Sequence, residues 1–162
     1  MLSERPYLRG DYPRETTSVV TWLICAIAGA FVLQFAAVSG WGTPAAGMVR
    51  ELAFSVNNVA EGRAWTPFTH WLLHSTGNLF HVGLTLVGLH LLGRELLGDL
   101  GARRFLGIFA TGILIGAIAW GAVNWRSEGI LIGSTAGLYG LVAVYALLYP
   151  NREISFLLFF FF

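Results

Sequence analysis

The chain has 162 residues, of which 56% are apolar and only 12% are charged, against about 25% charged in an ordinary soluble domain. This composition excludes a water-soluble globule, and a net charge of +1 without a basic run excludes a nucleic-acid-binding chain. The single cysteine, Cys25, lies in an apolar run and has no internal disulfide partner. We expect neither a metal site nor a cofactor.

Four apolar blocks have about the length that a helix needs to cross a bilayer, roughly 20 residues. They predict membrane spans over about residues 19–39, 74–93, 105–123 and 130–149, with the start of a fifth at 154–162. The expected fold class is therefore all-α, a polytopic membrane helix bundle in the lipid bilayer. Polar residues at the start of the second span must be wrapped in protein, because lipid offers them no hydrogen bonds.

The distribution of arginines predicts how the bundle is oriented. Residues 1–18 form a polar tail, and residues 40–69 carry the glycines and prolines of a long surface loop. All ten basic residues are arginines; three lie on the side of this loop, and the other seven lie on the side of the tail. Basic residues concentrate on the cytoplasmic side, so we expect a cytoplasmic N-terminus in the cell (inner or plasma) membrane and an outer loop over 40–69.

The fourth predicted span carries the most informative pattern. Glycines 129, 133, 137 and 140 fall on one face of a regular helix, where they favour close packing against a neighbouring helix. Ser134 and Thr135 place two hydroxyls near the start of this span, opposite the polar residues of the second span. Spacing alone leaves two interpretations open, a packing seam and a pair of functional hydroxyls.

Together these motifs resemble those of the rhomboid intramembrane serine proteases, over about residues 19–158. Residues 133–140 (GSTAGLYG) resemble the nucleophile motif, residues 62–66 (GRAWT) the glycine and tryptophan loop, and residues 92–106 a helix end with its basic sequel. The resemblance implies a serine that attacks a peptide bond in or beside a transmembrane segment of a substrate protein. It also implies a base histidine on a sixth helix, and a histidine and an asparagine on the second helix that stabilise the oxyanion.

The nucleophile motif departs from the family pattern. Thr135 takes the nucleophile position, with Ser134 as the alternative, and Ala136 stands where the family has glycine. A β-branched hydroxyl is crowded and restricted at χ1, and an alanine obstructs the approach of a substrate backbone. The expected packing positions are Gly133, Gly137, Tyr139 and Gly140.

Two registers compete for the oxyanion site. Counting back from Gly101 assigns the histidine to His81 and replaces the asparagine by Thr85, one turn further on. The alternative register uses His74 and Asn78, which keep the histidine-x-x-x-asparagine spacing. We prefer the first register, and expect His81 to approach the hydroxyls at positions 134 and 135.

No histidine follows residue 90, so the chain supplies no counterpart of the base. The apolar run that stops at Phe162 predicts a truncated, partial rhomboid-like domain over residues 19–162. Two functions stay open: an intramembrane serine endopeptidase, expected to be inactive in this form, and a non-catalytic rhomboid-like protein that binds transmembrane helices of clients. Either function makes membrane proteins the expected partners, and the oligomeric state is not predicted.

Overall fold

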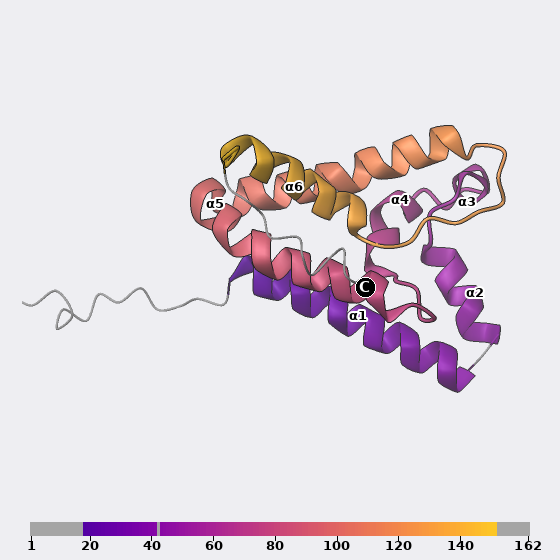
Figure 1. The fold of residues 1–162 in the computed structure, drawn as a ribbon. Coiled ribbons are helices and arrows are strands. Elements are labelled where there is room, and N and C mark those ends of the chain that lie inside the picture. Colours follow the sequence, from indigo (N-terminus) through magenta and orange to yellow (C-terminus); the bar gives the residue numbers. More distant parts are fainter. Residues whose placement is uncertain (1–17, 42, 152–162) are drawn as a thin grey trace, which may run out of the picture.

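The computed structural model describes residues 18–41 and 43–151, and every regular element within these ranges is a helix (Figure 1). The elements are, in chain order, α1 (Val19–Trp41), α2 (Thr43–Leu52), α3 (Val56–Ala60), α4 (Thr66–Thr69), the 3-10 helix η2 (His70–Leu72), α5 (Leu79–Val123) and α6 (Thr135–Leu148). The predicted tail 1–18, apart from Ser18, and the predicted fifth segment 154–162 lie outside the described residues.

The element α5 consists of two helices joined at Gly101. This glycine has φ 71° and ψ 163°, a conformation that side-chain-bearing residues rarely adopt, and the chain reverses direction there (Figure 1). At 1.5 Å per residue, each half, 79–100 and 102–123, reaches the roughly 30 Å of a bilayer core. The residues from Arg94 to Asp99, which lie between the predicted second and third spans, are helical as well.

The start of α5 also differs from the prediction. The second span was expected to begin near residue 74, but α5 begins at Leu79. Asn78 precedes the helix in an extended conformation, and its side-chain oxygen accepts a hydrogen bond from the Phe80 backbone N–H at 3.1 Å. An asparagine at this cap satisfies a backbone donor that the first turn leaves free, so the polar residues before it stay outside the helix.

Residues 40–69 are not a plain loop, because they contain α2, α3 and α4. Pro44 and Pro67, which suggested helix breaks, stand in the first turns of α2 and α4, where a missing N–H costs nothing. Arg63 ties the segment together through ion pairs to Glu51 and Glu61.

The core lies between α1, α6 and both halves of α5. A Cβ added at Gly93 would lie 2.9 Å from Val20 of α1, and one added at Gly88 would lie 2.7 Å from Leu138 of α6. Fully buried apolar side chains fill the contact, among them Ile27, Leu89, Leu96, Phe105 and Leu141.

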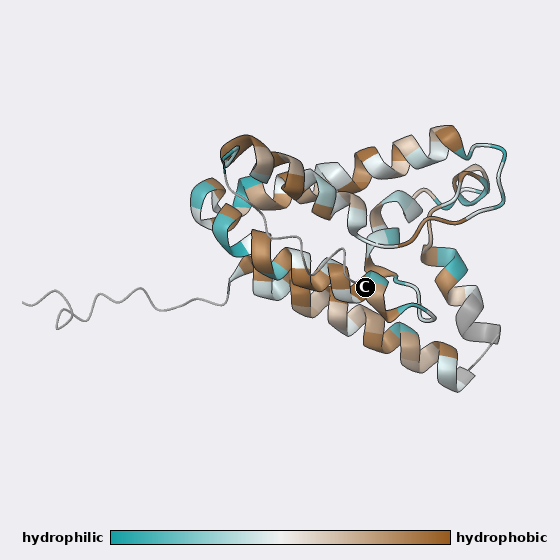
Figure 2. Cartoon of the chain, viewed as in Figure 1, coloured by the Kyte–Doolittle hydropathy of each residue, from teal (hydrophilic) through white to brown (hydrophobic). Residues whose placement is uncertain are grey.

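The outer surface of the helices is apolar, as lipid contact requires. Within the described residues, α1 over Val19–Gly40 and α5 are long and apolar enough to cross a membrane, whereas α6 is a shorter apolar helix. Figure 2 shows hydrophobic residues along the shafts and hydrophilic ones at the Gly101 turn and in the loops at the opposite end. Large apolar side chains remain exposed on these shafts, including Leu33, Ile118 and Leu147.

Candidate functional site

The segment before α6 places two hydroxyls at the start of that helix. Leu131 forms an isolated antiparallel bridge with Phe54, and the Gly133 N–H donates to the His70 carbonyl at 3.0 Å. The chain then turns at Gly133, with φ 101°, and α6 begins at Thr135 with Ser134 just before it. The predicted span over 130–149 is thus helical only from Thr135, and Gly129 and Gly133 precede the helix instead of lying on its face.

Ser134 pairs with His74, a histidine that the preferred register left aside. The Ser134 Oγ and the His74 Nε2 are 3.3 Å apart, and both residues have no solvent exposure. The other ring nitrogen, Nδ1, lies 3.4 Å from the Leu72 carbonyl, which can only accept. Nδ1 therefore carries the proton, and the Ser134 hydroxyl donates to Nε2.

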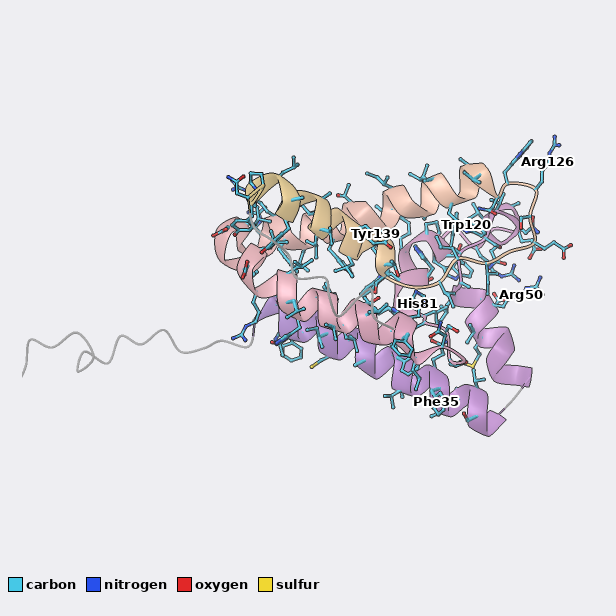
Figure 3. The ribbon with its side chains drawn as sticks, in the orientation of Figure 1. Phe35, Arg50, His81, Trp120, Arg126 and Tyr139 are labelled. Atoms are coloured by element: carbon cyan, nitrogen blue, oxygen red, sulfur yellow. The ribbon has the colours of Figure 1, made fainter. Side chains whose placement is uncertain are left out.

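Thr135 pairs with His81, so the predicted proximity of His81 to this end of α6 is confirmed. The Thr135 Oγ1 and the His81 Nε2 are 3.2 Å apart, and both residues are half-buried. The His81 ring packs on Gly133, since a Cβ there would lie 2.7 Å from its Cε1. Figure 3 shows His81 near the start of α5, close to the beginning of α6. The two imidazole rings, of His74 and His81, have centroids 5.2 Å apart.

The histidines of both predicted registers thus contact a hydroxyl of Ser134 or Thr135. Their predicted oxyanion partners, Thr85 and Asn78, do not. The Thr85 hydroxyl donates to the His81 carbonyl at 3.1 Å, within its own helix. The Asn78 side chain caps α5 and is exposed. Neither side chain is aimed at Ser134 or Thr135 in this arrangement, and their oxyanion role stays a prediction.

The predicted packing positions separate into two groups. Gly137 and Gly140 contact the second half of α5, because a Cβ at Gly137 would lie 2.7 Å from the Phe109 ring and one at Gly140 would lie 3.3 Å from the Ile108 carbonyl oxygen. Tyr139 does not pack, since 67% of it is exposed, and it lies on α6 in Figure 3.

Ala136, which stands where the family has glycine, packs against the second half of α5. A Cβ added at Gly116 would lie 2.4 Å from the Ala136 Cβ, and one at Gly112 would lie 2.8 Å from the Ala136 carbonyl oxygen. Ala136 therefore occupies the contact between α6 and the second half of α5. The glycines that permit close approach stand on α5, opposite the alanine.

Sequence reasoning missed Gln34 and His70. Gln34 of α1 forms two hydrogen bonds with the His74 backbone. It is the one amide in the predicted span over residues 19–39, which is itself the signal of a buried partner. His70 is fully buried, with Nδ1 3.2 Å from the Thr66 carbonyl and with no partner for Nε2.

Burial disfavours the charged form of the two histidines that precede α5, His70 and His74. Desolvation lowers the pKa of His74 to about 4, against a smaller opposing contribution from its hydrogen bond to the Leu72 carbonyl. Desolvation also lowers the pKa of His70, again opposed by hydrogen bonds to backbone carbonyls. His70 is the first residue of η2, and His74 lies between η2 and α5. Both residues are therefore outside the long apolar helices.

We predict that stability falls as pH drops from about 6.5 to about 4. In this window the unfolded chain protonates its histidines near 6.5, while folded His74 stays neutral, so protons favour the unfolded state. At about 1.4 kcal/mol per pKa unit, the loss at His74 amounts to roughly 3 kcal/mol. Thermal unfolding in detergent at stepped pH measures it.

Two variants separate this dependence from the general effect of acid. His74→Gln and His70→Gln are each expected to flatten the pH dependence in part, because each variant leaves the share of the other histidine. A stability that stays constant between pH 6.5 and 4 contradicts the prediction.

The described residues contain no group of three or more His, Cys, Asp or Glu side chains placed to hold a metal ion. The site they form instead is a pair of hydroxyl–imidazole contacts side by side at the start of α6. Such a contact activates a hydroxyl when the imidazole is a free acceptor, and it binds a carbonyl oxygen when the imidazole is a donor.

Residues 61–162 match the family model of the Rhomboid domain. No curated protein and no solved structure matches the chain. The match begins in the turn after α3 and includes both hydroxyl–imidazole pairs.

Proposed function

Because this chain belongs to the rhomboid family, we propose that it binds transmembrane segments of other membrane proteins beside the His81–Thr135 pair. The family comprises intramembrane proteases and rhomboid-like proteins, and the apolar helices make this chain an integral membrane protein. We further propose that the 162-residue chain by itself does not hydrolyse the segment that it binds.

The observation that carries this proposal is a difference between the two hydroxyl–imidazole pairs in exposure and in the type of hydroxyl. The pair with a free imidazole acceptor, Ser134 and His74, has no exposure through which a peptide reaches it. The half-buried pair has a threonine as its hydroxyl, and its imidazole is the residue that would have to stabilise the oxyanion. One imidazole cannot take the nucleophile's proton and also remain the neutral donor to the same intermediate. The accessible pair therefore suits recognition of a peptide carbonyl more than attack on it.

General-base assistance is worth roughly 10²–10⁴-fold in rate, and more where nucleophile and base act as one unit. Without it, a hydroxyl at neutral pH is a weak nucleophile. We therefore expect client binding without turnover.

A second candidate function, intramembrane endopeptidase activity, is favoured by the Ser134–His74 geometry. The hydroxyl donates to Nε2, and the Leu72 carbonyl holds the opposite ring nitrogen. This is the arrangement of a nucleophile, its base and an orienting acceptor. Movement of α6 that uncovers Ser134 would be required before a peptide bond came within reach.

Binding is tested with the purified chain in liposomes and a fluorescent transmembrane peptide. Thr135→Val keeps the shape of the side chain and removes its hydroxyl, and His81→Phe removes the imidazole. Each is expected to weaken binding about threefold to tenfold, the worth of one hydrogen bond. Thr111→Val is the matched control, because this exposed hydroxyl bonds only to the Gly107 carbonyl. Equal affinity in all variants would place binding elsewhere.

Turnover is tested with a fluorogenic transmembrane substrate. The chain is expected to give no more product than the double variant Ser134→Ala, Thr135→Ala. Product that Ser134→Ala alone abolishes would assign catalysis to Ser134 and His74 and establish the second candidate function instead.

A further inference from the structure

Gln34 reaches from α1 to the backbone of His74. Its Nε2 donates to the His74 carbonyl at 2.8 Å, and its Oε1 accepts from the His74 N–H at 3.0 Å. His74 lies between η2, which ends at Leu72, and α5, which begins at Leu79, so no helix supplies partners for these two groups. The amide takes the place of a neighbouring peptide, satisfying one donor and one acceptor at once.

We propose that Gln34 is the positioning residue of the site: its amide fixes the backbone of His74 so that the imidazole meets the Ser134 hydroxyl. The contacts run without interruption from α1 through Gln34 and His74 to Ser134 at the start of α6. Both His74 and Ser134 are fully buried, so a displaced imidazole finds no water to replace the hydroxyl. This inference rests on the proposed function only in treating the start of α6 as the site.

The chemistry of the amide explains why this position holds glutamine. Both a donor and an acceptor are needed, and of the side chains of that length only an amide provides them at every pH. An ionised glutamate retains the acceptor and loses the donor. The position lies within an apolar helix, where a polar side chain is costly unless it has partners.

The test uses the full chain in detergent micelles with isotope-labelled histidine. Gln34→Met removes both hydrogen bonds while preserving the length of the side chain, so it leaves little cavity. We expect the NMR signature of a single His74 tautomer to be replaced by exchange, and modification of His74 by diethyl pyrocarbonate to accelerate about tenfold, the loss of one to two hydrogen bonds. The signals of His81 are expected to stay unchanged.

Gln34→Glu and Leu33→Ala complete the design. Gln34→Glu is expected to give an intermediate acceleration, because it keeps one of the two hydrogen bonds. Leu33→Ala, at an adjacent position of α1 that is 72% exposed, is expected to change none of the histidines. His74 signals that are identical in Gln34→Met and the parent chain would overturn the proposal, as would an equal loss of the His74 and His81 signatures. Peptide binding is measured separately, so a failure of the proposed function is distinguishable from a failure of this inference.

Discussion

Alanine at Gly133 is expected to destabilise the protein by about 2 to 5 kcal/mol and to separate His81 from Thr135. The backbone at Gly133 has φ 101°, which costs a side-chain-bearing residue about 1–2 kcal/mol. The added Cβ would also lie 2.7 Å from the His81 ring, and overpacking of this kind costs about 1–3 kcal/mol. Denaturant unfolding in detergent measures the first effect, and binding of the transmembrane peptide measures the second.

Gly62→Ala is the matched control for this substitution. Gly62 also has a positive φ, 92°, but nothing lies within 4 Å of its added Cβ. The Gly62→Ala variant is expected to lose only the stability that the backbone conformation costs, about 1–2 kcal/mol, and to bind the transmembrane peptide as the parent chain does. An equal loss of stability in the two variants would contradict the prediction, because it would mean that the His81 ring moves away from the added Cβ without an energetic cost.

Cysteines placed at the two ends of the bundle are expected to label in an all-or-none manner. Val59 lies on α3 and is 40% exposed, and Gly98 precedes the turn at Gly101, where the two halves of α5 meet at the opposite end of the bundle. In a Cys25→Ala background, Val59→Cys is expected to react with a membrane-impermeant thiol reagent in intact cells. Gly98→Cys is expected to react only after lysis. We expect this because Gly98 lies on the side of the membrane that carries the excess of arginines, and basic residues concentrate on the cytoplasmic side.

The arrangement of the helices supplies the geometry for this experiment. Figure 3 places Arg50 and Arg126 at the end of the molecule where α1 finishes, away from the Gly101 turn. Labelling of Gly98→Cys in intact cells, with Val59→Cys protected, would reverse the proposed orientation. Removal of Cys25 is needed because that native thiol is exposed on α1.

The sequence predicted the long helices well and their ends poorly. The apolar run of α1 and the second half of α5 can be found by length alone. The start of α6 could not, because residues 130–149 are apolar throughout and periodicity does not distinguish an extended apolar segment from a helix. What holds Leu131 extended is its bridge to Phe54, a contact between residues far apart in the sequence that no local pattern encodes.

The site was predictable in part for a similar reason. A hydroxyl and an imidazole within apolar segments are costly unless each has a hydrogen-bond partner, so Thr135 and His81 could be paired from the sequence. The pairing of Ser134 with His74 depends on where α5 begins and on the hydrogen bonds from Gln34. Both depend on how α1 crosses the loop before α5, and that crossing is a property of the folded bundle.

The far end of α6 is attached to the first half of α5 by two hydrogen bonds. Tyr145 donates to Glu95 at 2.9 Å, and Tyr149 donates to Asp99, so both tyrosines attach the end of α6 to the first half of α5. Thr135 stands at the opposite end of this 14-residue helix, about 15 Å from Tyr145 and about 21 Å from Tyr149 at 1.5 Å per residue. A tilt of about 10° around the tyrosines would carry the Thr135 hydroxyl roughly 3 to 4 Å, enough to break a hydrogen bond. Any tilt of α6 about these tyrosine contacts would therefore displace Thr135 the most, and a small angular change would be enough to separate its hydroxyl from His81.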